Sequence, residues 1–332
     1  MDTSDLKKIL ATQPAYRLKQ VSRLIFIDLI TSWDQATTLP QSLRTRLKKN
    51  CPLEIKALPS VSKDKKTVKA LVTLADQSQI ETVLMKSPDG RRTVCLSSQI
   101  GCLLGCTFCT TGRLKFKRNL KTSEILEQYL YFARHLKAAG EKITNVVFMG
   151  MGEPLLNLDN IFEAIKILND PTAANLGARH ISVSTAGLPD GIREIAKFPL
   201  QINLALSLNA PNDELRSRLM PINKKYPLPD VLAAIDYYIK ITRRQVMFEY
   251  VLLKDTNDSP AHARELARLV SGRLAIINLI PANPGTIGNK PPTSEIIDRF
   301  QKILEKSGCQ VTRRRPFGDD IKGACGELAA GK

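Results

Sequence analysis

The chain has 332 residues, and 43% of them are hydrophobic, which is enough for one large domain with an appendage or for two ordinary domains. It carries 49 lysine and arginine residues against 32 aspartate and glutamate residues, a net charge of +17. No apolar run reaches the ~20 residues of a membrane span, and residues 1–5 lack the pattern of a secretory signal, so we expect a soluble cytoplasmic protein with no membrane contact.

The positive charge is concentrated near the N-terminus. Residues 1–70 contain 14 basic and 6 acidic residues, so +8 of the net charge lies in about a fifth of the chain. An excess of this size can be an ordinary basic surface, but it is more typical of a protein that binds a polyanion. Nucleic acid is therefore the leading candidate for a partner.

The N-terminal part is predicted to be helical. Residues 1–50 alternate apolar and charged positions at helical spacing, with breaks at Pro40 and Pro52, so we assign 1–60 to a small helical accessory domain, with nucleic acid as its expected ligand. β-Branched residues and alternation within 66–86 predict an antiparallel hairpin, in a connector that spans 61–92.

From residue 93 onward, apolar strand-like runs alternate with amphipathic segments of helical length. The predicted strands are 93–98, 143–149, 180–185, 202–208, 246–253 and 275–281, with a last strand near 309–315. The predicted helices are 122–139, 159–169, 188–197, 212–219, 228–242, 260–271 and 293–307. Strict alternation implies parallel strands with right-handed crossovers, so residues 93–332 are predicted to form an α/β core, a partial (β/α)6 barrel. The loop 282–292 is expected to be mobile.

Three of the seven cysteines lie within eight residues, as Cys102-x-x-x-Cys106-x-x-Cys109. Three thiolates in one loop can each bind one iron of a 4Fe–4S cubane and leave the fourth iron open. A zinc site with Cys95 as the fourth ligand is the alternative, although structural zinc usually shows two well-separated cysteine pairs. Three buried structural thiols are a further reading, and this density of cysteines disfavours it.

Polar residues follow each predicted parallel strand. Besides the cysteine loop, these are Gly152 and Glu153, Ser184, the run Ser207, Leu208 and Asn209, then Asn257 and Asn283. Each one alone is typical of a turn or a helix cap. Together they define one rim, because α/β barrels place their active sites at the C-terminal ends of the strands. Gly152 and Glu153 are suited to binding an ammonium group.

Four longer motifs extend this pattern. They are Cys95 to Cys102 (CLSSQIGC), Gly150 to Asn157 (GMGEPLLN), Met220 to Tyr226 (MPINKKY) and Gly318 to Gly326 (GDDIKGACG). The three-cysteine spacing resembles the radical S-adenosylmethionine (radical SAM) superfamily, and the four motifs resemble the methyltransferases that modify adenine C2 in 23S rRNA and tRNA (RlmN). The resemblance runs from about residue 10 to the C-terminus. Pro154 favours this group over its sister group, which methylates adenine C8 and confers antibiotic resistance (Cfr).

The resemblance implies a radical mechanism on a cysteine. Cys102, Cys106 and Cys109 would hold the 4Fe–4S cluster, and Gly152, Glu153, Ser184, Ser207, Leu208, Asn209 and Asn283 would bind S-adenosylmethionine. Cys325 would be methylated first, and a radical on that methyl group would then add to the adenine. Cys95 would attack Cys325 and release the product as a disulfide forms. Glu81 would be the proton acceptor, although an exposed strand carboxylate is the alternative interpretation of this residue.

The resemblance also implies the partners, namely RNA and a reducing electron donor such as flavodoxin or ferredoxin, for a protein that acts as a monomer. Asn209 stands where the family usually has histidine, which weakens one expected cofactor contact. Two alternatives stay open: an adenine C8 methyltransferase, and a zinc-stabilised RNA-binding module without catalysis. The basic runs 113–121 and 313–315 are expected to contact phosphates.

Overall fold

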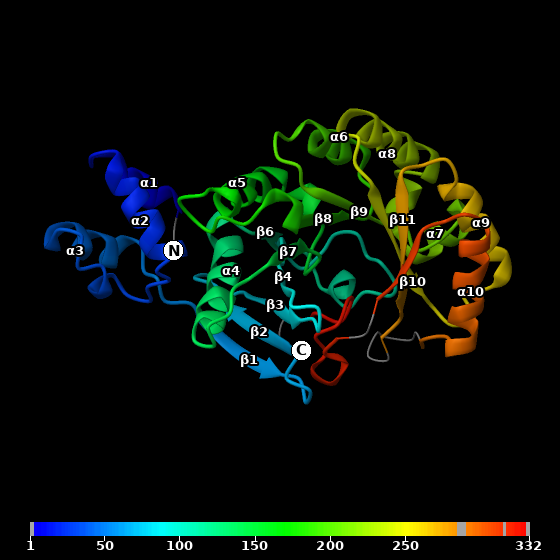
Figure 1. Ribbon diagram of the computed structural model, residues 1–332, viewed down its shortest axis with the longest axis horizontal. Helices are drawn as coiled ribbons and strands as arrows, with labels where there is room; N and C mark the ends of the chain where they lie inside the picture. The colour runs from blue at the N-terminus through cyan, green and yellow to red at the C-terminus, as the bar shows by residue number, and fades with distance from the viewer. Residues whose placement is uncertain (1–2, 284–289, 315–316, 330–332) are drawn as a thin grey trace.

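A computed structural model describes residues 3–283, 290–314 and 317–329. Its central feature is a ten-stranded sheet in the order β1-β2-β3-β4-β7-β8-β9-β10-β11-β12 (Figure 1). The strands from β4 to β12 pair in parallel, whereas β1, β2, β3 and β4 pair in antiparallel fashion. The predicted parallel α/β core, a partial barrel, is confirmed.

The parallel strands fall within or beside the predicted ranges. They are β4 (Arg92–Cys95), β7 (Asn145–Phe148), β8 (Ile181–Thr185), β9 (Asn203–Ser207), β10 (Val246–Leu252), β11 (Ala275–Pro281) and β12 (Val311–Arg313). Most of them are apolar and buried because helices cover their outer face, as expected for parallel strands, whereas the edge strand β12 is largely exposed.

The helices of the core lie on the convex side of the curved sheet (Figure 1). They are α4 (Thr122–Lys137), α5 (Leu158–Asn169), α6 (Pro189–Lys197), α7 (Asp213–Leu219), α8 (Leu228–Thr242), α9 (Pro260–Val270) and α10 (Ser294–Lys306). Local sequence sets their starts. At α9, for example, the Ser259 hydroxyl accepts a hydrogen bond from the backbone N–H of His262 at 3.2 Å, and Pro260 occupies the first turn.

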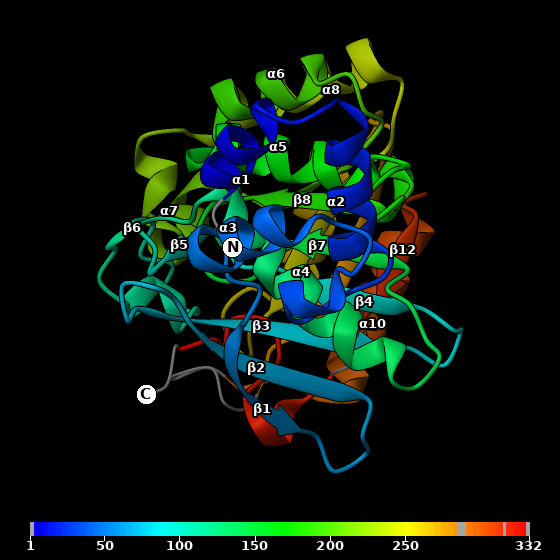
Figure 2. The same ribbon diagram turned by 90° about the vertical axis from the view of Figure 1, so that its left-hand side faces the viewer.

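The antiparallel strands extend the sheet beyond β4. They are β1 (Lys56–Val61), β2 (Thr67–Thr73) and β3 (Gln79–Lys86), and β3 pairs with β4 through Val83 and Cys95. The predicted hairpin is therefore continuous with the main sheet. Strand β1 spans the boundary predicted at residue 60, and the division into domains stays a prediction. Figure 2 shows this sheet edge beside the C-terminal segment.

The N-terminal helices α1 (Thr3–Ala11), α2 (Tyr16–Phe26) and α3 (Gln41–Asn50) gather at one end of the molecule (Figure 1). The Arg134 guanidinium on α4 joins them to the core by donating to the carbonyls of Ile30 and Leu53, at 2.6 and 2.8 Å. In the part of the chain that the structure describes, no helix is long and apolar enough to cross a membrane.

Short elements complete the chain. They are the two-stranded sheet of β5 (Gln99–Ile100) and β6 (Arg118–Asn119), and six 3-10 turns: η1 (Trp33–Gln35), η2 (Thr111–Arg113), η3 (Pro154–Leu156), η4 (Ala178–His180), η5 (Pro221–Lys224) and η6 (Asp319–Ile321). Residues 284–289 of the loop expected to be mobile lie outside the described residues.

Candidate functional site

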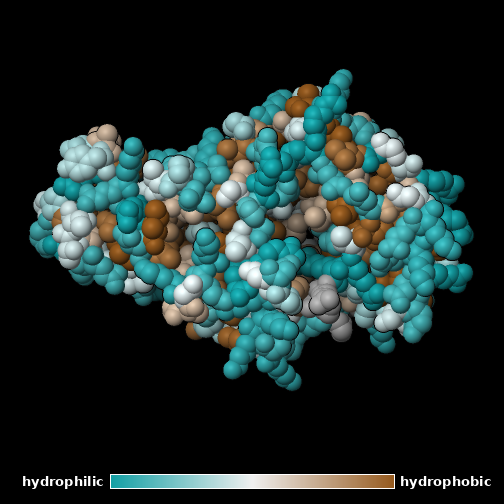
Figure 3. Space-filling view, viewed as in Figure 1, coloured by the Kyte–Doolittle hydropathy of each residue, from teal (hydrophilic) through white to brown (hydrophobic). Residues whose placement is uncertain are grey.

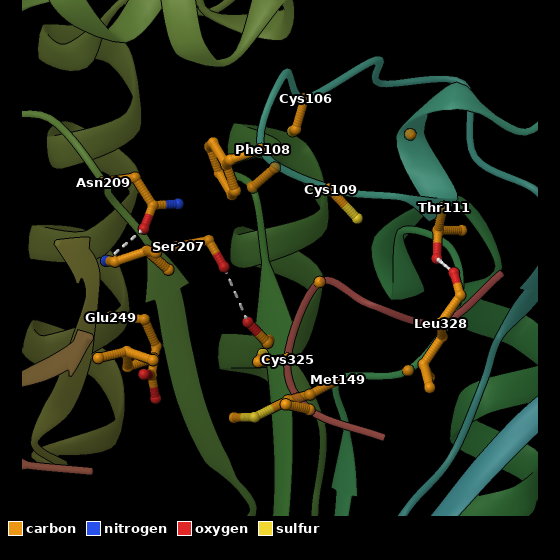
Figure 4. A pocket seen from close by; sticks show the side chains of 18 of the residues that line it. Cys106, Phe108, Cys109, Thr111, Met149, Ser207, Asn209, Glu249, Cys325 and Leu328 are labelled. Carbon is orange, nitrogen blue, oxygen red and sulfur yellow. Dashed lines mark hydrogen bonds between the residues drawn. The ribbon is translucent and has the colours of Figure 1, made fainter. Parts of the chain in front are cut away.

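A cavity lies at the C-terminal ends of the parallel strands (Figure 4). It collects most of the predicted site residues, although they are far apart in sequence. Its lining includes Cys95, Cys102, Cys106, Cys109, Gly152, Glu153, Ser184, Ser207, Asn209, Asn283 and Cys325. Leu208 and Asn257 are fully buried outside this lining, and Glu81 also lies outside it. The space-filling view shows a mostly hydrophilic face around this region (Figure 3).

The loop that carries the three clustered cysteines is closed at its base by the pairing of β5 with β6. Gly101 lies in this closure with φ +72°, and a Cβ atom there would come within 2.3 Å of the Lys115 carbonyl oxygen. A side chain is therefore excluded, and the backbone of the loop can fold back tightly. The loop tip is tied to α7, because the Thr107 N–H donates to the Leu219 carbonyl at 3.0 Å.

The three thiols of this loop are half-buried and face the cavity. Burial raises the pKa of Cys102 to about 11, and it also raises the pKa values of Cys106 and Cys109. A bound cation would therefore be needed to hold them as thiolates.

The donor set fits a cubane. Three thiols on one loop face the same cavity. A cubane binds each thiolate through a different iron and accepts a wider arrangement.

Gly152 and Glu153 form a fixed carboxylate beside the cysteine loop. Gly152 has φ +97°, and a Cβ atom there would lie 2.4 Å from the Cβ of Gln99. The Glu153 carboxylate accepts hydrogen bonds from the N–H groups of Leu155 and Ala186, at 3.1 and 2.8 Å. Burial raises its pKa to about 7. The site can therefore present an oriented acid group to a cationic ligand.

Strands β8 and β9 present two hydroxyls to the cavity, because the Oγ atoms of Ser184 and Ser207 lie 3.2 Å apart. Asn209 follows with φ +58°, a left-handed conformation that asparagine tolerates. Its Oδ1 accepts from the Val251 N–H at 2.9 Å, and its Nδ2 lies 3.4 Å from the Met220 sulfur. Leu208 packs in the core, and it separates its two polar neighbours in the sequence, Ser207 and Asn209.

The segment that carries Cys325 passes across the cavity (Figure 4). The Asn283 side-chain amide donates to the Cys325 carbonyl at 3.1 Å. The Thr110 N–H donates to the Gly326 carbonyl, and the Thr111 hydroxyl donates to the Leu328 carbonyl, both at 2.7 Å. The cysteine loop and the Cys325 segment are thus joined directly.

Cys95 ends β4 and lines the same cavity as Cys325. Burial raises the pKa of Cys95 to about 12, and the neighbouring Cys325 adds to the rise. Cys95 is therefore a neutral thiol at rest. The structure brings together the two cysteines that the sequence singled out beyond the cluster motif.

Comparisons with known proteins agree with this geometry. Residues 96–267 match the radical SAM superfamily. The chain is 41% identical to a protein named "Probable dual-specificity RNA methyltransferase RlmN" from Dictyoglomus thermophilum, over 99% of this chain and 95% of that protein. A protein of the same name from Chloroflexus aurantiacus is 44% identical, over 98% and 90%.

A solved structure, described as a radical SAM methyltransferase from Sphaerobacter thermophilus, covers 99% of this chain and 98% of its own with 42% identity and a TM-score of 0.95. The chain belongs to the RlmN family of radical SAM methyltransferases. This membership confirms the resemblance inferred from the motifs.

Glu81 lies on β3, outside the cavity lining. Its carboxylate lies 2.9 Å from the Lys69 ammonium and accepts a 2.6 Å hydrogen bond from the Ala329 N–H. Both carboxylate oxygens are thus engaged away from the cavity lining. Its role as the proton acceptor stays a prediction.

Three residues of the RlmN site were missed or misread in the sequence. Phe108 and Glu249 line the cavity, and the Asn278 amide donates to the Glu249 carboxylate at 2.8 Å. A lone glutamate inside the apolar strand 246–252 was the available signal. Arg314 was expected to contact phosphate, yet it lines the cavity, with Nη2 3.6 Å from the Met85 sulfur.

Proposed function

We propose that this chain methylates C2 of an adenine in 23S rRNA, tRNA or both, through a methyl-cysteine on Cys325. One observation carries the proposal: the three-cysteine loop, Cys95 and Cys325 share a single cavity. RNA as the substrate is supported by the printed names of the relatives.

The three thiols Cys102, Cys106 and Cys109 would hold the 4Fe–4S cluster. When bound, the cluster supplies the electron that cleaves S-adenosylmethionine and starts the radical chemistry. The residues proposed to bind S-adenosylmethionine are Gly152, Glu153, Ser184, Ser207, Leu208, Asn209 and Asn283. Glu153 is suited to the ammonium group of that cofactor because its carboxylate is already fixed by two backbone N–H groups.

The other two cysteines of the cavity, Cys325 and Cys95, are proposed to form covalent bonds at different steps. The Cys325 sulfur accepts the methyl group and becomes bonded through that carbon to the adenine. The Cys95 sulfur, on losing its proton, then attacks the Cys325 sulfur. The S–S bond forms, the bond from the Cys325 sulfur to the bridging carbon breaks with its electron pair going to the carbon, and a proton added there completes the methyl group of the released base. Their shared cavity supports this sequence. Flipping the adenine out of its stack is the expected way to expose C2 to them.

The accessory region 1–60 is proposed to bind RNA, next to a connector 61–92 and the catalytic core 93–332. Helix α3 supports this role, because Arg46 and Lys49 are exposed on it and it contains no acidic residue. We further propose that the protein acts as a cytoplasmic monomer and receives electrons from a donor such as flavodoxin or ferredoxin.

The test is the identity of the methylated nucleoside. Reconstituted protein, reductant, S-adenosylmethionine and RNA should yield 2-methyladenosine after digestion, separated from an 8-methyladenosine standard by chromatography and mass spectrometry. Only 8-methyladenosine would overturn the C2 assignment in favour of the resistance-type enzyme. A colourless zinc protein without product would favour the non-catalytic alternative.

The same reaction needs a matched pair of variants. Cys325→Ala should give no methylated adenosine, whereas Cys309→Ala should give the wild-type yield, because Cys309 lies outside the cavity lining. A normal yield from Cys325→Ala would contradict the methyl-cysteine route.

A further inference from the structure

The segment that carries Cys325 is held at both of its ends by one ion pair. The Lys69 ammonium donates to the Lys322 carbonyl at 3.3 Å, three residues before the cysteine. The Glu81 carboxylate accepts from the Ala329 N–H at 2.6 Å, four residues after it. Lys69 and Glu81 contact each other at 2.9 Å. The pair therefore closes the loop 322–329 around Cys325.

The pair is placed by the antiparallel extension of the sheet. Lys69 on β2 faces Val83, and Leu71 faces Glu81 on β3, so Lys69 and Glu81 are diagonal neighbours on one face. Their side chains are 14% and 5% exposed. A charge pair this enclosed is held in one geometry, because separating the two groups would leave each charge buried without its partner.

The same face of β2 also seats the residues that precede the loop. The Asp320 carboxylate accepts from the Lys63 N–H at 2.8 Å. Gly318 has φ +67°, and a Cβ atom there would lie 2.7 Å from Thr67 Cγ2. The chain from 318 to 329 is thus laid down along β2 and β3, as Figure 2 shows for its red-coloured part beside β1 and β2.

We propose that Lys69 and Glu81 form a clip that positions Cys325 in the cavity toward Cys95. Glu81 is then a positioning residue, and Lys69 matters as much as Glu81. The consequence for methylation rests on the proposed function, but the clip itself does not. A proton acceptor would need only Glu81, so the phenotype of a Lys69 variant separates the two roles.

Hydrogen exchange on the full chain without cofactor tests the clip directly. Lys69→Met should speed exchange of the Ala324 and Glu327 amides by about tenfold or more, because their hydrogen bonds lie within the released loop. Lys69→Arg should restore most of the protection, since it retains a cationic donor. Lys86→Met is the matched control, because it breaks the Lys86–Glu141 pair on the same hairpin without touching the segment.

Two outcomes would overturn the clip. One is wild-type exchange at Ala324 and Glu327 in folded Lys69→Met and Glu81→Gln. The other is an equal rise in Lys86→Met, which would indicate general loosening of the hairpin.

Product formation then separates the roles of Glu81. With the clip, Lys69→Met and Glu81→Gln should lower kcat to a similar extent and leave its pH profile unchanged. Loss of product in Glu81→Gln alone, with full activity in Lys69→Met, would overturn the positioning role. Absence of product from the wild type, with the exchange result intact, would refute the proposed function and leave the clip standing.

Discussion

The two walls of the cavity are built in different ways. One wall is the rim of parallel strands that alternate with helices, where Ser184 and Ser207 lie within strands and Glu153 lies in the loop after β7. The other wall is the segment around Cys325, which has little regular structure and is held by residues 42 to 253 positions away. The rim can thus form without the segment, whereas the segment depends on partners from the rim, the cysteine loop and the antiparallel strands.

This difference predicts that substitutions in the cysteine loop and in the Cys325 segment abolish different steps of the reaction. Cys106→Ala should abolish iron binding at the normal stoichiometry and formation of 5′-deoxyadenosine, because two thiolates are too few for a stable cubane. The measurements are iron content and product analysis after anaerobic reconstitution. Cys325→Ala should retain both, since Cys325 is not one of the three proposed cluster ligands. A Cys106→Ala protein that still cleaves S-adenosylmethionine would show that the ligand assignment is wrong.

Cys95 and Cys325, which line the same cavity, should differ in the product that accumulates when each is replaced. Cys95→Ala should stall with RNA joined to Cys325 through a one-carbon bridge, because Cys95 is needed only for release. Cys325→Ala should form no covalent bond to RNA. A denaturing gel after turnover should show a slow, nuclease-sensitive band for Cys95→Ala alone.

The double variant is the control for that experiment. An adduct that persists when both Cys95 and Cys325 are replaced would arise from another nucleophile and would refute the methyl-cysteine mechanism. The cluster assignment would be unaffected.

The same contrast explains how far the sequence could predict the site. The strand and helix ranges came from apolar periodicity, and the rim followed because the ends of parallel strands share one edge. Which way a side chain points on an isolated strand did not follow. The resemblance assigned Glu81 as the proton acceptor, whereas its contacts with Lys69 and the C-terminal segment follow from the pairing of β2 with β3. Arg314 was predicted to contact phosphate as part of a basic run, and its place in the cavity lining did not follow from the sequence either. Only tertiary contacts decide such cases.

Glu153 on the rim should make the free energy of unfolding depend on pH. The raised pKa of Glu153, about 7 against 4.5, means that the folded cofactor-free protein binds a proton that the unfolded chain releases. This contribution to stability is complete below pH 4.5 and is lost as pH rises to about 7, up to about 3 kcal/mol. Urea unfolding of the wild type against Glu153→Gln at pH 5 and 7.5 measures it. An equal pH dependence in the two proteins would mean that Glu153 does not titrate in this window.

The smallest expected effect lies outside both walls, on α3. Arg46 and Lys49 are exposed there, and their replacement by alanine should leave the cavity and its chemistry intact. If each residue contacts one phosphate, the slope of log affinity against log salt should fall by about 0.7–0.9 for each residue replaced. Lys197→Ala is a suitable control, because that exposed lysine pairs with Glu194 on α6, far from the N-terminal helices (Figure 1). RNA titrations at several salt concentrations provide the measurement. An unchanged slope in the α3 double variant, with cofactor cleavage preserved, would move the RNA contact away from this helix and onto the basic residues around the cavity.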